Sequence, residues 1–393
     1  MARTAHRPRV IPTPARRMHH SRPAPKPTQE HDPRPNHKQF VSAPAAHGDI
    51  TAQLPTALEA VISRVAQHSL AAGTLANYSS AVKGYIDFCH TYGIPADQLF
   101  PAREPVICAF AASHAGAFTG STAANHIAAL KTTHALNNWP WEGGARLKHI
   151  LRGVTNLAPR SSTKDPRPPV TIHMLRQLRS HLDLELPKDA AVFAMALVLF
   201  WGQSRLGEVA GQSRRNTTSK VLPTIRSIGE RFTRLGSREL HLPRTKTAQR
   251  DGQNIILTRQ EDDIDPIHAI AHLLKINKNP PPSTNIFTYL SGPNGTLRAL
   301  TREEFIGRCN EVWSAHGLPR FSGHSFRIGG TSALLDMGVP PEVVREMGRW
   351  KSDAFYRYWR GLRGIATNYV ENIHLRDRRE RITQPAHRPC PAS

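Results

Sequence analysis

The chain has 393 residues, 39% of them hydrophobic, which is enough for two folded domains and a tail. Its formal charge of +22, with a pI near 10.6, exceeds what solubility requires and favours a polyanionic partner, because each neutralised phosphate releases counterions. No run reaches about eighteen uncharged apolar residues, so no membrane span is expected.

Cysteine spacing and short basic runs bear on the compartment. The chain has four scattered cysteines, Cys89, Cys108, Cys309 and Cys390. Without paired spacing they argue against a disulfide scaffold or a zinc module and indicate a reducing, intracellular environment. Arg16-Arg17 and the run 376–381 are candidate nuclear-import signals, so the expected localisation is nuclear.

Residues 1–48 form a basic, proline-rich tail with nine prolines, nine Lys or Arg and two acids. Such a segment cannot bury enough apolar surface to offset its ordering entropy, so we predict that it is disordered. It is either an arm that contacts DNA electrostatically or an inert linker. Because its net charge is only +7, most of the positive charge lies on the folded part.

Residues 51–157 are predicted to form a helical domain. Apolar residues recur at helical spacing from Leu58 to Val65 and from Leu75 to Cys89, and helices are also expected over 106–117 and 145–154. Ser121 or Thr122 is the candidate N-terminal cap of a further helix, which lies between the helices expected over 106–117 and 145–154. Five basic side chains either face a phosphate backbone or form a solvated face. They are Lys83, Lys131, Arg146, Lys148 and Arg152.

The segment 158–169 reads as a linker, and residues 170–373 as a second domain, followed by a flexible tail over 374–393. Helices are expected over 171–182, 189–201, 265–274 and 301–313. The run 189–201 is apolar nearly all round, which indicates a central core helix. Residues 239–242 and 254–257 predict a β-hairpin.

A stretch near the C-terminus carries the residues that suggest chemistry. His324 and Arg327 stand three residues apart, so they share one face of a helix. Gly348-Arg349-Trp350 and then Tyr356 and Tyr358 follow a turn over 338–341. A cation, an imidazole, an indole and a phenol suit phosphoryl transfer to a tyrosine.

The order of these motifs resembles that of the tyrosine recombinases, the phage integrase-like family. A helical module precedes a linker and a mixed domain with Arg205-x-Gly207-Glu208, a hairpin lysine, His-x-x-Arg, Gly-Arg-Trp and a tyrosine. The segment 348–355, GRWKSDAF, resembles the crypton-type branch of eukaryotic mobile elements. The resemblance covers about residues 51–372.

The resemblance implies a fold that is mainly α with a small β-sheet. An N-terminal helical core-binding (SAM-like) domain would precede a mixed α+β catalytic domain. The implied activity is site-specific cutting and rejoining of double-stranded DNA through a 3′-phosphotyrosyl link, with no metal and no cofactor. Such enzymes usually act as homotetramers on paired sites, exchanging C-terminal segments, here 363–377.

The resemblance also assigns roles to individual residues. Arg205 and Arg327 would fork onto the phosphate oxygens, and Glu208 would support Arg205. Lys246 matches the catalytic lysine, although Arg244 and Arg250 lie close to it in sequence. In that role it would protonate the leaving 5′-oxygen.

The remaining roles concern the nucleophile and its surroundings. Tyr358 is the expected nucleophile, since a helix would turn Tyr356 away from it by about 200°, and Tyr356 stays the alternative. His324 is the candidate base, because a free tyrosine of pKa about 10 is mostly protonated at neutral pH. Trp350 takes the place of a His or Trp that bonds a phosphate oxygen.

Three rival functions are weighed against this interpretation. A metal-dependent nuclease needs converging carboxylates, and the dense acidic cluster 261–265 is better explained as a loop or helix cap. A type IB topoisomerase shares the chemistry, but the short helical module favours a recombinase. A non-catalytic, domesticated DNA-binding protein is the alternative from another class.

Overall fold

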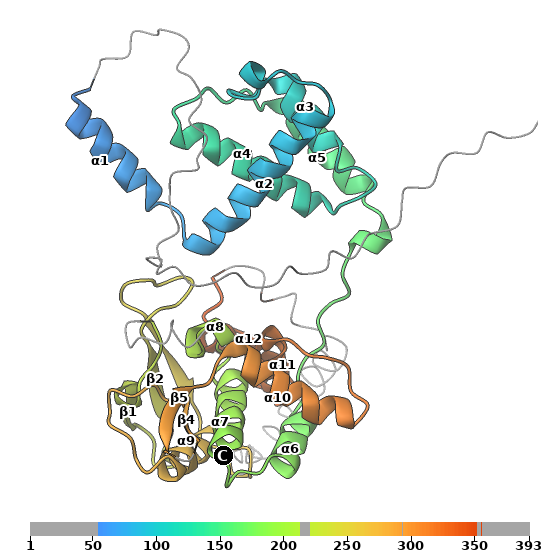
Figure 1. Ribbon diagram of the computed structural model, residues 1–393. Coiled ribbons are helices and arrows are strands. Elements are labelled where there is room, and N and C mark those ends of the chain that lie inside the picture. The colour runs from blue at the N-terminus through green and yellow to red at the C-terminus, as the bar shows by residue number, and fades with distance from the viewer. Residues whose placement is uncertain (1–53, 213–220, 293, 352–354, 356–393) are drawn as a thin grey trace, which may run out of the picture. The chain divides into compact units, whose positions relative to one another are not determined.

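The computed structural model describes residues 54–212, 221–292, 294–351 and residue 355. The chain divides into two compact units, Met1–Lys164 and Asp165–Ser393 (Figure 1). Several predictions lie outside the described residues, namely the tails 1–48 and 374–393, both basic runs, Cys390 and the exchange segment 363–377. The described fold is mainly α with two small antiparallel sheets, as predicted.

The N-terminal unit is helical throughout its described part. Its helices are α1 (Thr56–Gln67), α2 (Ala72–Thr91), α3 (Glu104–Ala112), α4 (Gly120–Leu136) and α5 (Ala145–Asn156), with short 3₁₀ turns at Ala96–Gln98 and Arg160–Ser162. Tyr85 and Cys89 on α2 are fully buried, and the Tyr85 ring meets Phe110 of α3 edge-on at 5.3 Å. The predicted apolar spacing on α2 therefore builds the core.

Two helix boundaries in this unit differ from the prediction. The cap of α4 is Thr119, whose side chain accepts from the Thr122 backbone N–H, and not Ser121 or Thr122. The first residue of the helix is a glycine, Gly120, because a Cβ there would overlap the Thr155 side chain of α5. The helix expected over 106–117 is α3, which ends at Ala112.

Helix α1 has the predicted spacing but does not bury its apolar side chains. Leu58, Val61, Ile62 and Val65 are between 44% and 64% exposed. The pattern thus predicted the helix correctly, while periodicity alone could not show whether another element covers it. No described helix of the chain is long and apolar enough to cross a bilayer.

The C-terminal unit mixes helices with short strands. Its helices are α6 (Ile172–His181), α7 (Pro187–Trp201), α8 (Leu206–Val209), the 3₁₀ turn η5 (Ile225–Ser227), α9 (Pro266–Ile276), α10 (Arg302–Ala315), α11 (Gly323–Asp336) and α12 (Pro341–Met347). Its strands are β1 (Ile228–Arg231), β2 (Arg238–Leu242), β3 (Gln253–Leu257), β4 (Thr288–Ser291) and β5 (Thr296–Ala299). The helix expected over 301–313 is α10, which begins with a capping box of Thr301 and Glu304.

The predicted hairpin is the β2–β3 pair of a three-stranded antiparallel sheet ordered β1-β2-β3. Leu240 pairs with Ile255, and both are buried, so the alternation of β2 and β3 directs one face to the core. Strand β1 was not predicted. A second two-stranded sheet joins β4 and β5.

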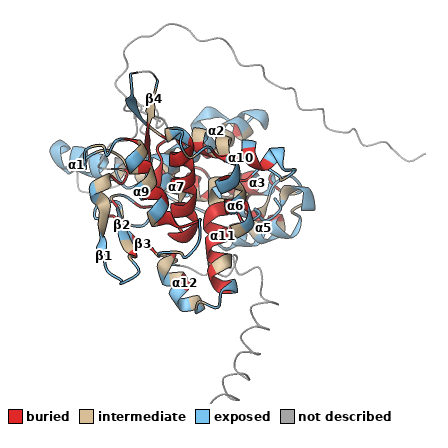
Figure 2. Ribbon diagram, turned by 90° about the horizontal axis from the view of Figure 1, so that it is seen from below, coloured by how far each residue is buried: buried red, intermediate tan, exposed pale blue. Residues whose placement is uncertain are grey.

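Helix α7 is the centre of this unit, as predicted from its apolar run. Every side chain from Asp189 to Trp201 is buried, and Figure 2 shows α7 and α11 as the reddest helices. Gly329 and Gly330 allow α11 to approach closely. A Cβ on Gly330 would overlap the carbonyl oxygen of Phe200, at the end of α7.

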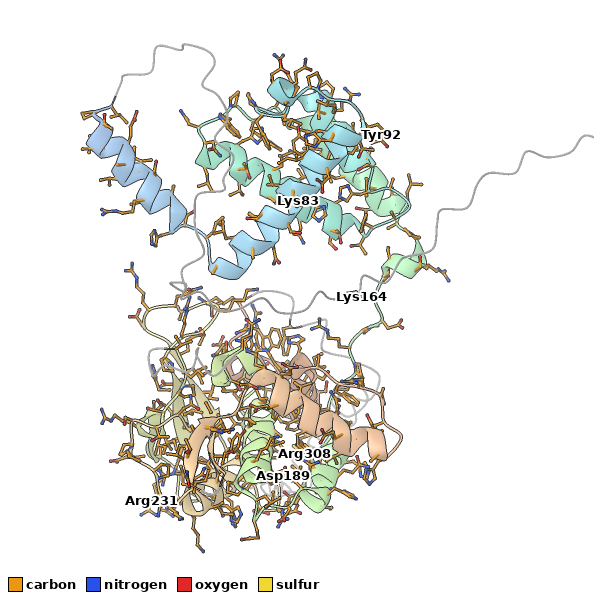
Figure 3. All side chains as sticks on the ribbon, in the orientation of Figure 1. Lys83, Tyr92, Lys164, Asp189, Arg231 and Arg308 are labelled. Carbon is orange, nitrogen blue, oxygen red and sulfur yellow. The ribbon has the colours of Figure 1, made fainter. Side chains whose placement is uncertain are left out.

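The one acidic side chain in this buried run is compensated by an arginine. Asp189 accepts from Arg308 of α10 through two bonds, Nε–Oδ1 of 2.9 Å and Nη2–Oδ2 of 2.8 Å. Figure 3 shows the two side chains side by side. A bidentate pair satisfies the buried carboxylate and ties α10 to the start of α7.

Candidate active site

The candidate site begins where α7 ends. After Gly202 the chain turns at Gln203, which has a left-handed backbone (φ +45°) and no exposed surface. Its side chain accepts from the Thr331 hydroxyl at 2.8 Å and donates to the Val344 carbonyl at 3.4 Å. Gln203 therefore ties the end of α7 to α11 and α12, and it fixes the direction in which the chain enters Arg205.

Arg205 precedes the short helix α8 and faces Glu208 across its first turn. The Arg205 backbone N–H donates to Glu208 Oε2 at 3.0 Å, and its Nη1 donates to Oε1 at 2.7 Å. The Arg205 side chain is 27% exposed, whereas that of Glu208 is 4% exposed. The expected support of Arg205 by Glu208 thus exists as a contact, with the guanidinium on the accessible side.

Glu208 also binds a second arginine from a distant segment. Arg349 Nη2 donates to Glu208 Oε2 at 2.8 Å, so one carboxylate joins two guanidiniums. Burial alone would raise the pKa of Glu208, but the charge of Arg349 and the bonds from both arginines outweigh it and hold the pKa below its usual value. Glu208 is therefore ionised at neutral pH.

The His-x-x-Arg pair lies in the first two turns of α11. Gly323 begins this helix against α8, where a Cβ would come within 2.5 Å of Leu206 Cδ2. His324 is half-buried on the next position, and Arg327 is completely buried. The close approach of α11 to α8 thus brings both residues to the segment that contains Arg205.

Arg327 joins two backbone segments. Its Nη1 donates to the Gln203 carbonyl and its Nη2 to the Gly348 carbonyl. Its guanidinium carbon also lies 3.9 Å from the centre of the Trp350 ring, a cation–π contact. In this structure Arg327 braces the site by joining these segments.

Trp350 is half-buried beside this brace. Its backbone N–H donates to the Arg345 carbonyl at 3.1 Å, and Arg345 Nε returns a bond to the Trp350 carbonyl at 3.3 Å. Its ring centre lies 6.4 Å from that of the buried Phe355. The indole thus packs against both the scaffold and Arg327.

Lys246 occupies the loop between β2 and β3 and is exposed. Its neighbours hold the loop, because Thr245 and Thr247 both donate to Gln253 Oε1, at 2.8 and 3.1 Å. Among the described residues, no hydrogen bond links Lys246 to Arg205 or to Arg327. Arg244 donates to Gln249 at 2.9 Å, so it is committed within the same loop.

The two tyrosines considered as the nucleophile, Tyr356 and Tyr358, lie outside the described residues.

The acidic cluster 261–265, which was considered for a metal site, has other partners in the structure. Asp265 caps α9 by accepting from the His268 N–H at 2.6 Å, and Asp262 pairs with Arg176 at 2.8 Å. These acids therefore act as a cap and an ion pair.

The basic residues proposed for DNA in the N-terminal unit are all exposed. Lys83, labelled in Figure 3, pairs with Asp87 at 3.0 Å. Lys148 and Arg152 are four residues apart on α5 and share a face, whereas Arg146 points away from them. Lys131 is on α4. The set spans more than one helix face.

Two residues of the site received no role from the sequence, Gln203 and Arg349. A glutamine with positive φ has no distinct sequence signal. Arg349 was visible in Gly-Arg-Trp, but its pairing with Glu208 joins positions 141 residues apart and needs the fold.

No family model matches the chain, and no curated protein matches it. Among solved structures, it is similar to the XerH site-specific recombinase bound to palindromic difH substrate, with 13% identity, 75% of this chain and 79% of that chain covered, and a TM-score of 0.49. It is similar to the Tn1549 transposon integrase bound to transposon right-end DNA, with 13% identity, 76% and 93% covered, and a TM-score of 0.46. It is also similar to a lambda integrase dimer bound to a COC′ core site, with 14% identity, 77% and 94% covered, and a TM-score of 0.40.

Proposed function

We propose that the chain is a tyrosine recombinase that cuts and rejoins double-stranded DNA through a 3′-phosphotyrosyl intermediate. The observation that carries the proposal is the convergence of Arg205 and Arg327 on one junction. Arg327 donates to the carbonyl of Gln203, which lies two residues before Arg205. It also donates to the carbonyl of Gly348, which precedes Arg349, and Arg349 shares Glu208 with Arg205. Two distant motifs thus meet at the end of α7.

The chemistry that these residues would perform is a transfer of the phosphoryl group between two oxygens. The Tyr358 hydroxyl attacks phosphorus, its proton passes to His324, and the bond to the 5′-oxygen breaks. Lys246 gives a proton to that leaving oxygen. Arg205 binds the non-bridging oxygens, whose charge grows in the pentavalent state. Rejoining reverses these steps, so the bond energy is conserved and no metal is invoked.

The proposal includes a rearrangement at the second arginine. Arg327 has no exposed surface and uses both Nη atoms on backbone carbonyls. Its contact with a phosphate therefore forms when DNA binding opens the junction. The exposed Lys246 loop would close over the same phosphate.

The wider biological setting also belongs to the proposal. We place the enzyme in the nucleus, as the product of a crypton-type mobile element, acting as a homotetramer on paired sites. The motif Gly348-Arg349-Trp350 supports the element type, and the formal charge of +22 supports a DNA partner.

The proposal is tested by covalent capture. The full-length chain is incubated with a pool of nicked duplexes of random sequence, and DNA that stays attached to protein in detergent is recovered and sequenced. Tyr358→Phe is expected to abolish attachment while duplex binding in a gel-shift assay persists. Tyr356→Phe is the matched control and is expected to retain attachment.

Further variants and conditions separate the roles. Arg205→Ala or Arg327→Ala is expected to lower attachment about 10²-fold or more. A chelator is expected to have no effect, and loss of attachment in its presence would refute the metal-free mechanism. If the wild-type chain binds duplex but never becomes attached, the protein is the non-catalytic DNA-binding protein instead.

A further inference from the structure

Arg349 holds an unusual backbone position for an arginine. It follows the C-terminus of α12 with φ +56°, in the left-handed region where a glycine is the common choice after a helix. Its N–H donates to the Glu346 carbonyl at 2.9 Å, which completes the last turn. A side chain with a Cβ costs free energy in this conformation, so an arginine here indicates a use for its guanidinium.

The guanidinium of Arg349 is buried yet incompletely bonded. Its side chain is 8% exposed, and its Nη2 contacts Glu208 at 2.8 Å. Nε and Nη1 are shielded from solvent, and no described residue accepts a hydrogen bond from either. Buried donors without acceptors are rare in folded proteins, so two on one side chain point to a ligand.

The charge of the cluster has the sign that an anion requires. Glu208 carries one negative charge and binds two guanidiniums, so the trio of Arg205, Glu208 and Arg349 has a net positive charge. The two arginines bond to different oxygens of the same carboxylate, Oε1 and Oε2. A tetrahedral anion bound to Arg205 would therefore lie close to Arg349.

We propose that Arg349 is a further catalytic residue, which donates through Nε and Nη1 to a non-bridging oxygen of the phosphate bound by Arg205. The shielded nitrogens reach the anion when the turn 348–351 moves on binding. Glu208 keeps the two guanidiniums together before this contact forms. The role of Arg349 in strand cleavage rests on the proposed function, whereas the binding of an anion by Arg349 does not.

Anion binding is tested first, because it needs no cleavage. Full-length wild type, Arg349→Gln and Arg349→Lys are melted in phosphate and in chloride at equal ionic strength. Phosphate is expected to raise the melting temperature of wild type more than that of either variant. Arg349→Lys keeps the charge beside Glu208 but lacks the two donors, so it reports on the contact if Arg349→Gln does not fold.

Arg176→Gln is the matched control for this measurement. It also removes one arginine bonded to one carboxylate at 2.8 Å, but at the exposed pair with Asp262. It is expected to respond to phosphate as wild type does. An equal phosphate response in wild type and Arg349→Lys would overturn the proposal.

The rate of covalent attachment then tests whether the anion that Arg349 contacts is the scissile phosphate. On a duplex recovered by covalent capture, Arg349→Lys is expected to slow attachment about 10²–10³-fold. On the same duplex with a methylphosphonate, which lacks one charged oxygen at the scissile position, the variant is expected to lose less than about tenfold. Equal losses on both substrates would show that Arg349 acts only through Glu208. Absence of attachment by wild type would refute recombination, while the phosphate melt still decides the contact.

Discussion

Replacing Glu208 by Gln tests the buried ion cluster most directly. The carboxylate is 4% exposed and lies 2.7 Å from Arg205 and 2.8 Å from Arg349, so its removal leaves two guanidiniums facing a neutral amide. Breaking a buried pair in this way costs about 3–5 kcal/mol. In a unit of this size that corresponds to a fall in melting temperature of roughly 6–20 °C.

The assay is urea unfolding of the full-length chain, with Glu311→Gln as the control. Glu311 lies 3.1 Å from Arg308 but is 67% exposed, so the same substitution there is expected to cost about 0–1 kcal/mol. Because the pKa of Glu208 is lowered on folding, its contribution is complete at neutral pH. The contribution is lost as the pH falls below about 4.3, where wild type and Glu208→Gln should converge. Equal costs for both variants at pH 7 would refute the reasoning.

Three further predictions concern other parts of the chain. Gly330→Ala is expected to lower the free energy of unfolding by about 1–3 kcal/mol in a urea titration, because its Cβ meets the end of α7. Gly307→Ala on α10 is the control, and it should not destabilise the protein because the space around Gly307 is open. Burial lowers the pKa of His134, whose neutral Nε2 accepts a backbone N–H at 2.8 Å. The free energy of unfolding of the N-terminal unit should therefore fall as the pH drops below about 6.5, as measured by NMR of α4 during urea unfolding. Trp350→Ala should slow covalent attachment more than Trp350→Phe, by up to about 2 kcal/mol of activation free energy, because phenylalanine keeps a ring beside Arg327.

Elements with a strong local pattern could be predicted from the sequence. The apolar run of α7 and the alternating residues of β2 and β3 appear where they were expected. A helix buried on all sides needs a continuous apolar run, and a strand buried on one face needs alternation, so both can be read from the sequence. Strand β1, Ile228–Arg231, was missed since it is short and its last two residues are exposed. The cap of α4 was misassigned because Thr119, Ser121 and Thr122 can all cap a helix, and the structure uses Thr119.

The site was predictable as a set of residues but not as an arrangement. Motif order singled out Arg205, Glu208, His324, Arg327 and Trp350. The complete burial of Arg327 and its bonds to two carbonyls could not be predicted, because they depend on how α11 packs against α7.

The left-handed turn at Gln203 has a consequence for how mutations spread through the C-terminal unit. Arg205 lies two residues after Gln203, and Arg327 bonds to the Gln203 carbonyl. The positions of both arginines therefore depend on the last residues of α7. A cavity made in α7, for example by Leu199→Ala, would displace the two arginines as a pair while their spacing is kept. A variant with such a cavity should therefore show weaker covalent attachment in the capture assay at raised temperature, while duplex binding in the gel-shift assay persists.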